Sequence, residues 1–369
     1  MRLRITTTPA AVRALRWLSY VALATLVVVL AAEVPDYRLV SLCQVAAMAV
    51  AAMGLNFVSG FCGQISVGHG AFYGVGAYTT AVLVTRYDWP FLAALPVSGV
   101  VGLLAGLLVG IPALRVRGFY LALVTLALTV TFPTLANLDQ LSRFTGGPNG
   151  LPVYVLADPP SWYPLAATPA GWKFLELSAV AAVMFVLAGN MLRSRVGRAL
   201  VAVRDQETAA AASGVNTAAW KIGAFAVSAG YAAVGGGMIL LAVPVVTPDL
   251  GGFTTSVSIL AALVIGGTAT RWGPLFGAFL VIWLPVLATD WGSDLPLLND
   301  RTEPLVAVAF YGALLAVVVL VMPGGIADGL RRLTANFVRA RPPAHSAHGP
   351  KSEVPPLAAN AASNTVPKG

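Results

Sequence analysis

The chain has 369 residues, of which 57% are hydrophobic and only 10% charged, and its formal net charge is +8. Soluble domains carry about 25% charged residues, so this composition, with a mean hydropathy of +0.80, excludes an ordinary soluble protein. The basic residues form no patch with interleaved aromatic residues, which excludes a nucleic-acid partner. Charges are nearly absent from repeated runs of about 20 residues, a length that crosses a bilayer as a helix. The sequence therefore predicts an all-α, polytopic transmembrane helical bundle, since the strand alternation of a β-barrel is missing.

The apolar runs predict about ten spans within a membrane domain of residues 17–322. Residues 1–16 are basic and precede the first run. That pairing is also typical of a cleaved signal peptide, but a retained first span is favoured because many more runs follow. The predicted spans are Trp17–Ala32, Leu39–Val58, His69–Thr85, Phe91–Ile111, Phe119–Asn137, Phe174–Leu192, Trp220–Val243, Thr254–Gly267, Pro274–Thr289 and Leu305–Met322.

Charge in the loops predicts the orientation of these spans. With the N-terminus in the cytoplasm, 18 of the 23 Lys and Arg residues fall on cytoplasmic segments. Such a bias sets membrane topology, so both termini are predicted to be cytoplasmic. The run Thr254–Gly267 is too short for a full crossing and suggests a half-helix or re-entrant segment. An even number of crossings is still favoured, because an odd number puts the basic tail outside. That tail, residues 323–369, is predicted to be disordered.

A glycine-rich stretch, GLNFVSGFCGQISVGHGAFYGVG, interrupts the apolar pattern from Gly54 to Gly76. Glycine permits unusual backbone conformations and close helix approach. Polar, unwound backbone at membrane depth is tolerated only against protein or a watery cavity. One interpretation is a broken helix that lines a translocation path, and the alternative is tight glycine packing plus a cytoplasmic turn. A lone histidine favours a structural role over a proton relay. The candidate path residues are Asn56, Gly63, Gln64, Ser66, Gly68 and His69.

The longest polar interval, Ser194–Gly214, lies between two apolar runs, in a loop of residues 194–219 that this topology places in the cytoplasm. It predicts a short amphipathic helix that the membrane domain offers to a soluble partner. Its arginines are equally suited to contact lipid headgroups.

Motifs for covalent chemistry are missing. The sequence contains no GxxxxGK[ST] phosphate loop and no HExxH or GxSxG motif, so no catalytic residue is predicted and the chain is expected not to be an enzyme. Two cysteines and three scattered histidines do not make a metal site. The spans are almost free of acidic residues, which argues against transport driven by an ion gradient. No cofactor is therefore expected on this chain.

Four blocks of the sequence resemble branched-chain amino acid ABC transporter permeases of the LivM type. The block ETAAAASG, Glu207–Gly214, is similar to the glutamate–alanine–glycine loop of ABC-importer permeases, although Thr208 stands where alanine is usual. The four blocks, which lie between Leu39 and Met322, are Gly54–Leu83, Gly118–Leu151, Ser194–Ala229 and Ile259–Leu280.

This resemblance implies a multi-pass permease subunit in a bacterial inner or plasma membrane. Its partners would be a second related permease, two ATP-binding cassette ATPases that bind the ATP, an extracytoplasmic solute-binding protein and the lipid bilayer. Glu207, Ala210 and Gly214 would belong to the helix that docks on an ATPase, with Arg198 and Arg204 at its edge. The expected substrates are leucine, isoleucine and valine, and the alternatives are urea, short amides or aromatic acids. A stand-alone secondary transporter or channel, or a membrane scaffold, is the competing interpretation.

Overall fold

The computed structural model describes residues 25–113, 119–153 and 168–292, together with the single positions 312, 325, 326 and 329. The predicted basic N-terminus, nearly all of the last predicted span and most of the predicted tail lie outside these residues. Residues 25–33 are helical. The α-helices that follow are α2 (Asp36–Leu55), α3 (His69–Tyr87), α4 (Phe91–Ala113), α5 (Phe119–Ala136), α6 (Asp139–Thr145), α7 (Pro169–Arg193), α8 (Arg195–Asp205), α9 (Glu207–Ala212), α10 (Thr217–Met238), α11 (Phe253–Gly266) and α12 (Gly273–Gly292).

Short irregular elements connect these helices. A π-helical segment, η1 (Asn56–Phe61), extends α2, and 3-10 turns form η2 (Gly147–Asn149), η3 (Ile239–Leu241) and η4 (Pro248–Gly251). Two-residue strands, β1 (Leu151–Pro152) and β2 (Val245–Val246), pair antiparallel, with Leu151 opposite Val246. The bundle is therefore almost entirely helical, as the composition predicts.

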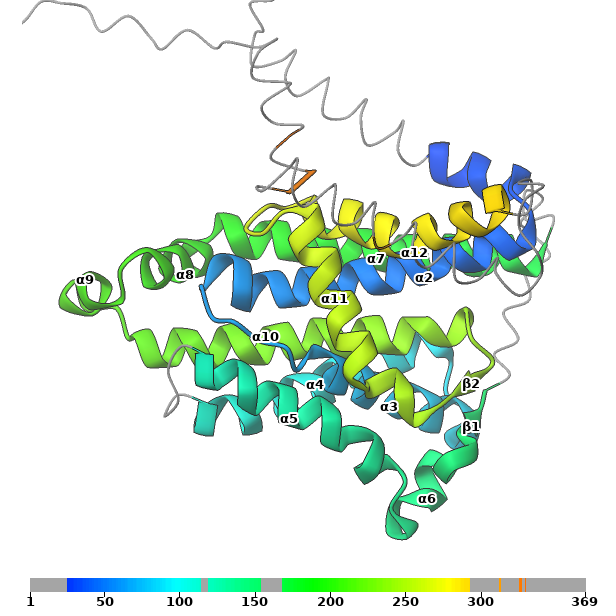
Figure 1. Cartoon of the computed structure of the whole chain (residues 1–369), viewed down its shortest axis with the longest axis horizontal. Helices are drawn as coiled ribbons and strands as arrows, with labels where there is room; N and C mark the ends of the chain where they lie inside the picture. The colour runs from blue at the N-terminus through cyan, green and yellow to red at the C-terminus, as the bar shows by residue number, and fades with distance from the viewer. Residues whose placement is uncertain are drawn as a thin grey trace, which may run out of the picture.

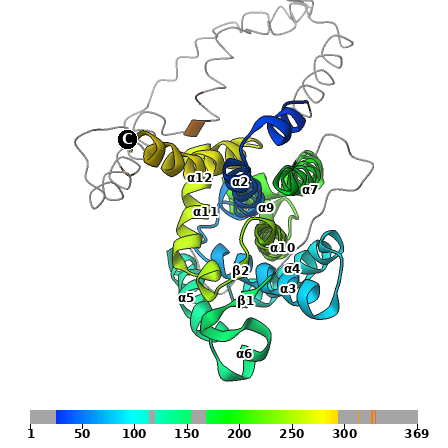
Figure 2. The ribbon, with the colours of Figure 1, turned by 90° about the vertical axis from the view of Figure 1, so that its right-hand side faces the viewer.

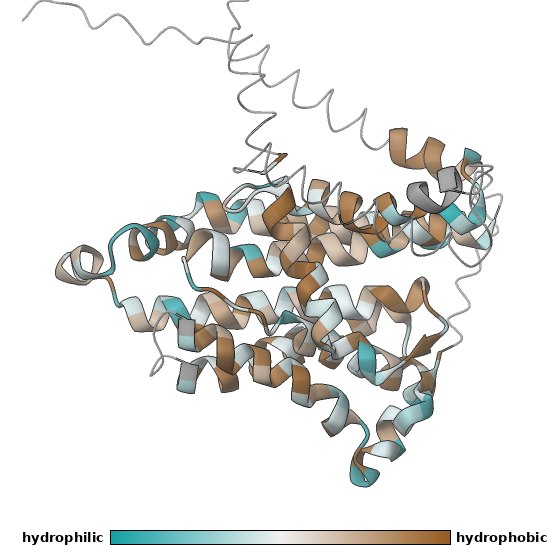
Figure 3. Cartoon of the chain, in the orientation of Figure 1, coloured by the Kyte–Doolittle hydropathy of each residue, from teal (hydrophilic) through white to brown (hydrophobic). Residues whose placement is uncertain are grey.

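By length and composition, four helical segments of the described chain are able to cross a membrane: Asp36–Phe61, Phe91–Pro112, Pro169–Arg193 and Thr217–Leu241. A fifth crossing results if α5 and the segment after it, which bend by 85°, count as one span. Hydrophobic residues predominate along much of the long helices (Figure 3). Exposed apolar side chains repeat along α4 at Val100, Leu104, Leu108 and Ile111, as expected of a helix that faces lipid. The total of ten spans stays a prediction.

Helix α10 is the centre of the bundle. It lies between α2 on one side and α3 and α4 on the other (Figures 1 and 2). Glycines make these contacts possible, because a Cβ atom on Gly76 would overlap the carbonyl group of Ala233, and one on Gly236 would overlap that of Tyr73. The hydroxyl of Tyr231 donates to the carbonyl of Met184, 3.1 Å away, and so ties α10 to α7. Close backbone packing of small residues thus holds the core together.

The chain also runs from one end of the bundle to the other through α3, and half of this passage is irregular. The chain leaves α2 and η1 next to α8, runs through residues 62–68 without helix, and begins α3 beside Ser228, near the middle of α10. At the far end of α3, the guanidinium of Arg86 lies over the ring of Phe144 in α6, 5.3 Å from its centre. Residues 62–87 therefore connect the α8–α9 end of the bundle to the opposite end (Figure 1).

The passage through α11 has the same construction and runs in the opposite direction. It starts at β2, which pairs with β1 at the end of the bundle away from α9, and passes through η4 before α11 begins. The 14 residues of α11 are about 21 Å long, and the loop that follows contacts η1 at the α8–α9 end. The short predicted span is thus a half-helix, and the irregular residues before it complete the passage.

The two half-helices meet at their N-terminal ends. The backbone N–H of Gly70 in α3 donates to the hydroxyl of Ser256 in α11 at 2.7 Å. A Cβ atom on Gly74 would lie 2.6 Å from the Cα atom of Gly251, so the segment before α11 touches α3 directly. Interrupted helices that pair inside a bundle are typical of transporters, where unwound backbone lines the route of the solute.

Candidate functional site

The predicted amphipathic helix at 194–219 is two helices, which corrects the expectation of one. α8 begins at Ser194, whose hydroxyl accepts from the N–H of Val196 at 3.1 Å and donates to the carbonyl of Met191 at 2.7 Å. One serine therefore caps both the end of α7 and the start of α8. The chain breaks again at Gln206, which is extended, with φ −158° and ψ 99°. α8 is amphipathic, since Gly197, Leu200 and Val203 are buried while Arg195 and Arg198 are exposed.

Helix α9 ends in a turn that requires glycine. Gly214 has a φ of +83°, its N–H donates to the carbonyl of Ala211, and the N–H of Val215 donates to that of Ala210, both at 3.0 Å. These bonds form a Schellman motif with Gly214 at the left-handed position. Ala210 is buried within this turn. The alanines and glycine of the predicted loop therefore build a small, sharply terminated helix.

Glu207 fixes the other end of α9. Its carboxylate pairs with the ammonium group of Lys221 in α10 at 2.5 Å, and the Lys221 side chain is only 19% exposed. Glu207 is also the first residue of α9, where a negative charge interacts favourably with the helix dipole. The ion pair and the glycine turn together hold α9 at the tip of the bundle, where it projects beyond the other helices (Figure 1).

Arg204, in the last turn of α8, contacts the predicted path segment. Its Nη1 donates to the carbonyl of Gly60 at 3.1 Å, and its Nε donates to Asp205 Oδ1 at 3.0 Å. Gly63 has a φ of +73°, and a Cβ atom there would lie 2.8 Å from the Cγ atom of Arg204. Arg198 is exposed and its guanidinium makes one weak bond, at 3.5 Å, to the carbonyl of Arg193. Only one of these two predicted arginines therefore reaches across the bundle.

Asn56, a predicted path residue, is fully buried and is used inside the protein. Its Nδ2 donates to the carbonyl of Thr270 at 2.7 Å, and its Oδ1 accepts from the N–H of Ala269 at 2.9 Å. Ala269 has a left-handed backbone, with φ +56°. Asn56 therefore pins the α11–α12 loop against η1, and its Nδ2 also donates to the sulfur of Met53 at 3.9 Å.

Replacing Asn56 with alanine is expected to lower the apparent melting temperature of the purified chain by about 3 °C. The substitution leaves the N–H of Ala269 and the carbonyl of Thr270 unpaired, which costs about 2 kcal/mol. Asn190→Ala is the matched control, because that side chain is exposed on α7. Melting in detergent measures both variants, and equal shifts would contradict the structural role of Asn56.

Ser66 and His69, two further predicted path residues, form one polar chain with Ser228. The Ser228 hydroxyl donates to the carbonyl of Gly54 at 2.6 Å, so it accepts from His69 Nε2, with which it is in contact. His69 Nδ1 then accepts from the hydroxyl of Ser66 at 3.2 Å. Both ring nitrogens are satisfied in the neutral imidazole, which supports the predicted structural role.

Residues 62–68 carry the remaining predicted path positions. Gly63 is exposed, Gln64 is partly exposed and the Ile65 side chain is 56% exposed. The N–H of Val67 donates to the Thr125 hydroxyl at 3.0 Å, but the carbonyls of residues 62–67 form no hydrogen bond within the described part of the chain. Gly68 is buried against Thr125 of α5. One side of this segment is thus held by α5, and its other side presents polar backbone.

Several residues of this arrangement were not singled out in the sequence. Gly60, which accepts from Arg204, lies in the glycine-rich stretch but looks no different from its neighbours there. Lys221 lies 14 residues after its partner Glu207 in the sequence. The two side chains meet because the chain turns back between α9 and α10. Ser256 stands in an apolar run, where its use by another helix leaves no local signal.

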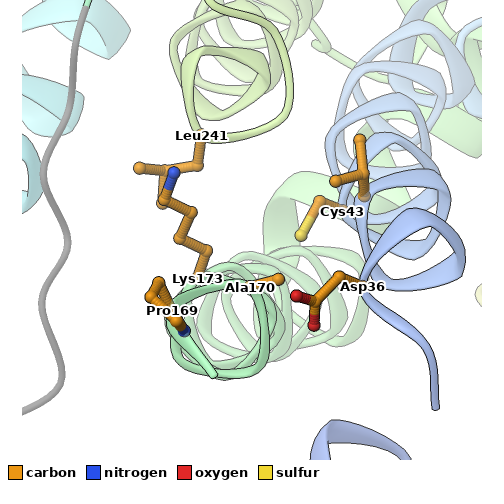
Figure 4. Close-up of a pocket in the computed structure, with 7 residues that line it drawn as sticks. Asp36, Cys43, Pro169, Ala170, Lys173 and Leu241 are labelled. Carbon is orange, nitrogen blue, oxygen red and sulfur yellow. The ribbon is translucent and has the colours of Figure 1, made fainter.

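A separate cavity of about 260 Å³ lies at the opposite end of the bundle, between α2 and α7 (Figure 4). It contains none of the predicted site residues, although Asp36 and Lys173 bring opposite charges to it. In the described residues no three His, Cys, Asp or Glu side chains gather to hold a metal ion. The residues that line this cavity are Asp36, Val40, Cys43, Pro169, Ala170, Lys173 and Leu241.

Comparison with known proteins identifies the family. Residues 37–321 match the model of the branched-chain amino acid transport system / permease component family. Over 264 residues the chain is 32% identical to the high-affinity branched-chain amino acid transport system permease protein LivM of Escherichia coli K12, covering 65% of this chain and 60% of that relative. No solved structure matches the chain significantly.

The alignments with two less similar relatives include a larger share of each relative's length. The permease protein BraD of Pseudomonas aeruginosa is 24% identical over 290 residues, or 75% of this chain and 90% of BraD. The ribose import permease protein RbsC of Haemophilus influenzae is 26% identical over 283 residues, or 72% of this chain and 83% of RbsC. The family match over residues 37–321, together with the helical bundle, makes this chain a multi-pass membrane protein that belongs to the branched-chain amino acid ABC transport permease family.

Proposed function

We propose that this chain is one permease subunit of an ATP-driven importer, in which separate ATPase subunits dock on α9. The observation that carries the proposal is the family match, since it includes α8, α9 and the segment before α3. The projection of α9 from the end of the bundle supports docking from that side. A bias of Lys and Arg toward that side supports its cytoplasmic location.

The route of the solute is proposed to pass residues 62–68 and the meeting point of α3 and α11. Exposed, unpaired backbone within a membrane domain requires a water-filled cavity or a protein partner. A second related permease facing this segment would provide both a wall and a seal. Asn56 and His69 support the route from behind, because their polar atoms already bond within the chain.

Branched-chain amino acids are the proposed substrates, as the names of most matched relatives indicate. Urea, short amides and aromatic acids are the alternatives, and one relative named for ribose import adds a sugar. The partners proposed for the complex are a second related permease, two ATPases and an extracytoplasmic solute-binding protein. ATP would bind on the ATPases alone.

The test is uptake of radiolabelled leucine, urea and ribose by cells that lack this gene and by cells in which it is restored. Leucine uptake that is lost and then restored, and that stops when ATP is depleted, is the expected result. Uptake of urea or ribose instead would change the substrate and leave the permease role intact. Uptake by the purified chain alone in vesicles, without any ATPase, would contradict the proposal.

A further inference from the structure

We infer that Arg204 is the link that transmits movement of α8 and α9 to the irregular segment at residues 62–68. The inference rests on the proposed function, because it concerns how that importer couples its two ends. Arg204 joins two segments that are 144 positions apart in the chain, through its hydrogen bond to Gly60. It would act as a positioning residue that contacts neither solute nor ATP.

The first step in the argument is the placement of Arg204. It lies in the last turn of α8, directly before the break at Gln206 from which α9 starts. A force on α9 therefore reaches Arg204 through two residues. The ion pair between its Nη2 and Asp205 Oδ1, at 2.9 Å, sets the orientation of the guanidinium group.

The second step is the target of the contact. Three segments meet at Gly60. Its carbonyl accepts a hydrogen bond from Arg204. A Cβ atom at this position would overlap Asn56 Oδ1 and would lie 2.6 Å from the N–H nitrogen of Ala269. Movement of Gly60 is thus shared with the α11–α12 loop. Through Gly60, α8 is therefore linked both to the segment that leads into residues 62–68 and to the loop that follows α11.

The third step is that the contact continues into the irregular segment. Gly63 packs closely against the Arg204 side chain, since a Cβ atom added at Gly63 would lie 2.8 Å from Cγ of Arg204. A glycine with φ +73° at this position lets the backbone turn around the arginine stem. Residues 62–67 have few internal hydrogen bonds to resist displacement, since their carbonyls are unpaired within the described chain. A small shift of α8 would therefore change the backbone that faces the proposed path.

The experiment uses the importer complex, purified from its native host by a tag on this chain and reconstituted in vesicles. Arg204→Ala is compared with Arg195→Ala, an exposed arginine in the first turn of the same helix. The number of leucine molecules imported per ATP hydrolysed is measured, together with the amount of ATPase subunit that co-purifies. For Arg204→Ala we expect unchanged co-purification and a ratio lowered roughly tenfold, the effect of one charge-assisted hydrogen bond. Arg195→Ala should keep the wild-type ratio.

A second variant approaches the same contact from the other side. Gly63→Ala should also lower the ratio, because its methyl group displaces Arg204. In the Arg204→Ala background the clash is absent and only the strain of alanine at φ +73° remains, so the same change should lower the ratio by a smaller factor than it does in the wild type. This pair keeps the inference testable if Arg204→Ala alone assembles poorly.

The outcomes separate the two proposals. A wild-type complex that contains no ATPase, or that hydrolyses ATP without importing any of the three solutes, would overturn the proposed function. A wild-type complex that imports leucine, with an unchanged ratio in both Arg204→Ala and Gly63→Ala, would overturn only the link through Arg204. An equal loss in Arg195→Ala would do the same, because it would assign the effect to charge on α8.

Discussion

Replacing Gly236 with leucine is expected to eliminate the folded protein. The Cβ atom of any side chain at this position would overlap the carbonyl of Tyr73, so α3 would have to move away from α10. Backbone carbonyls of a helix do not yield as a side chain does, and α10 is the helix around which α2, α3 and α4 pack. We expect a loss of about 4 kcal/mol or more, a size that marks disruption of the core.

The matched control lies on the same helix. Gly223 is also in α10, but a Cβ atom there would meet nothing within 4 Å. Gly223→Leu should therefore keep the fold, and it even replaces a poor helix former with a good one. Size-exclusion chromatography of fluorescently tagged variants measures both. A single sharp peak for Gly223→Leu and aggregate for Gly236→Leu is the expected result, and a sharp peak for both would contradict the packing argument.

The long spans could be predicted from sequence because their signal is local. An apolar run of sufficient length must be buried in lipid or protein whatever surrounds it, so α2, α4, α7 and α10 appear close to their predicted positions. Their ends differ by a few residues, as Leu39–Val58 against the observed Asp36–Phe61 illustrates. Polar residues at the ends of a helix do not reveal how far beyond the apolar run it continues.

The interrupted crossings could be predicted only in part. Glycines and polar residues indicate that regular helix is broken near residues 62–68, and the short run at Thr254–Gly267 indicates a half-helix. Where each half-helix begins depends on contacts such as Gly70 with Ser256, which are 186 positions apart. A single sequence does not contain that pairing, so the meeting of the two half-helices could not be predicted.

The candidate site divides in the same way. Glu207, Ala210 and Gly214 lie close together in the sequence. In the structure each of them contributes to the start, the packing or the end of the short helix α9. Arg204 was placed at the edge of that helix by the resemblance to ABC-importer permeases. Its contact with Gly60 lies outside any local pattern, and so does the use of Asn56 to hold the α11–α12 loop. The segment that forms α9 could thus be predicted, but the long-range contacts behind it could not.

Replacing Gly214 with valine is expected to detach the ATPase while the chain itself stays folded. The Schellman turn requires φ near the observed +83°, a conformation that a β-branched residue strongly disfavours. A Cβ atom at this position meets nothing within 4 Å inside the chain, so the effect comes from the backbone. A conformational cost of about 1–2 kcal/mol would reduce the population of correctly ended α9, and hence ATPase binding, roughly tenfold.

Gly214→Asn separates the backbone effect from side-chain size, because asparagine tolerates the left-handed conformation better than other residues. If the turn is what matters, Asn should retain most ATPase co-purification and most leucine uptake, and Val should lose both, with equal melting temperatures for the two isolated chains. If Asn is as damaging as Val, the ATPase must approach Gly214 too closely for any side chain, and docking depends on surface shape at this residue. Full ATPase binding by the Val variant would remove α9 from the docking site altogether, and the coupling route through Arg204 would then lose its starting point.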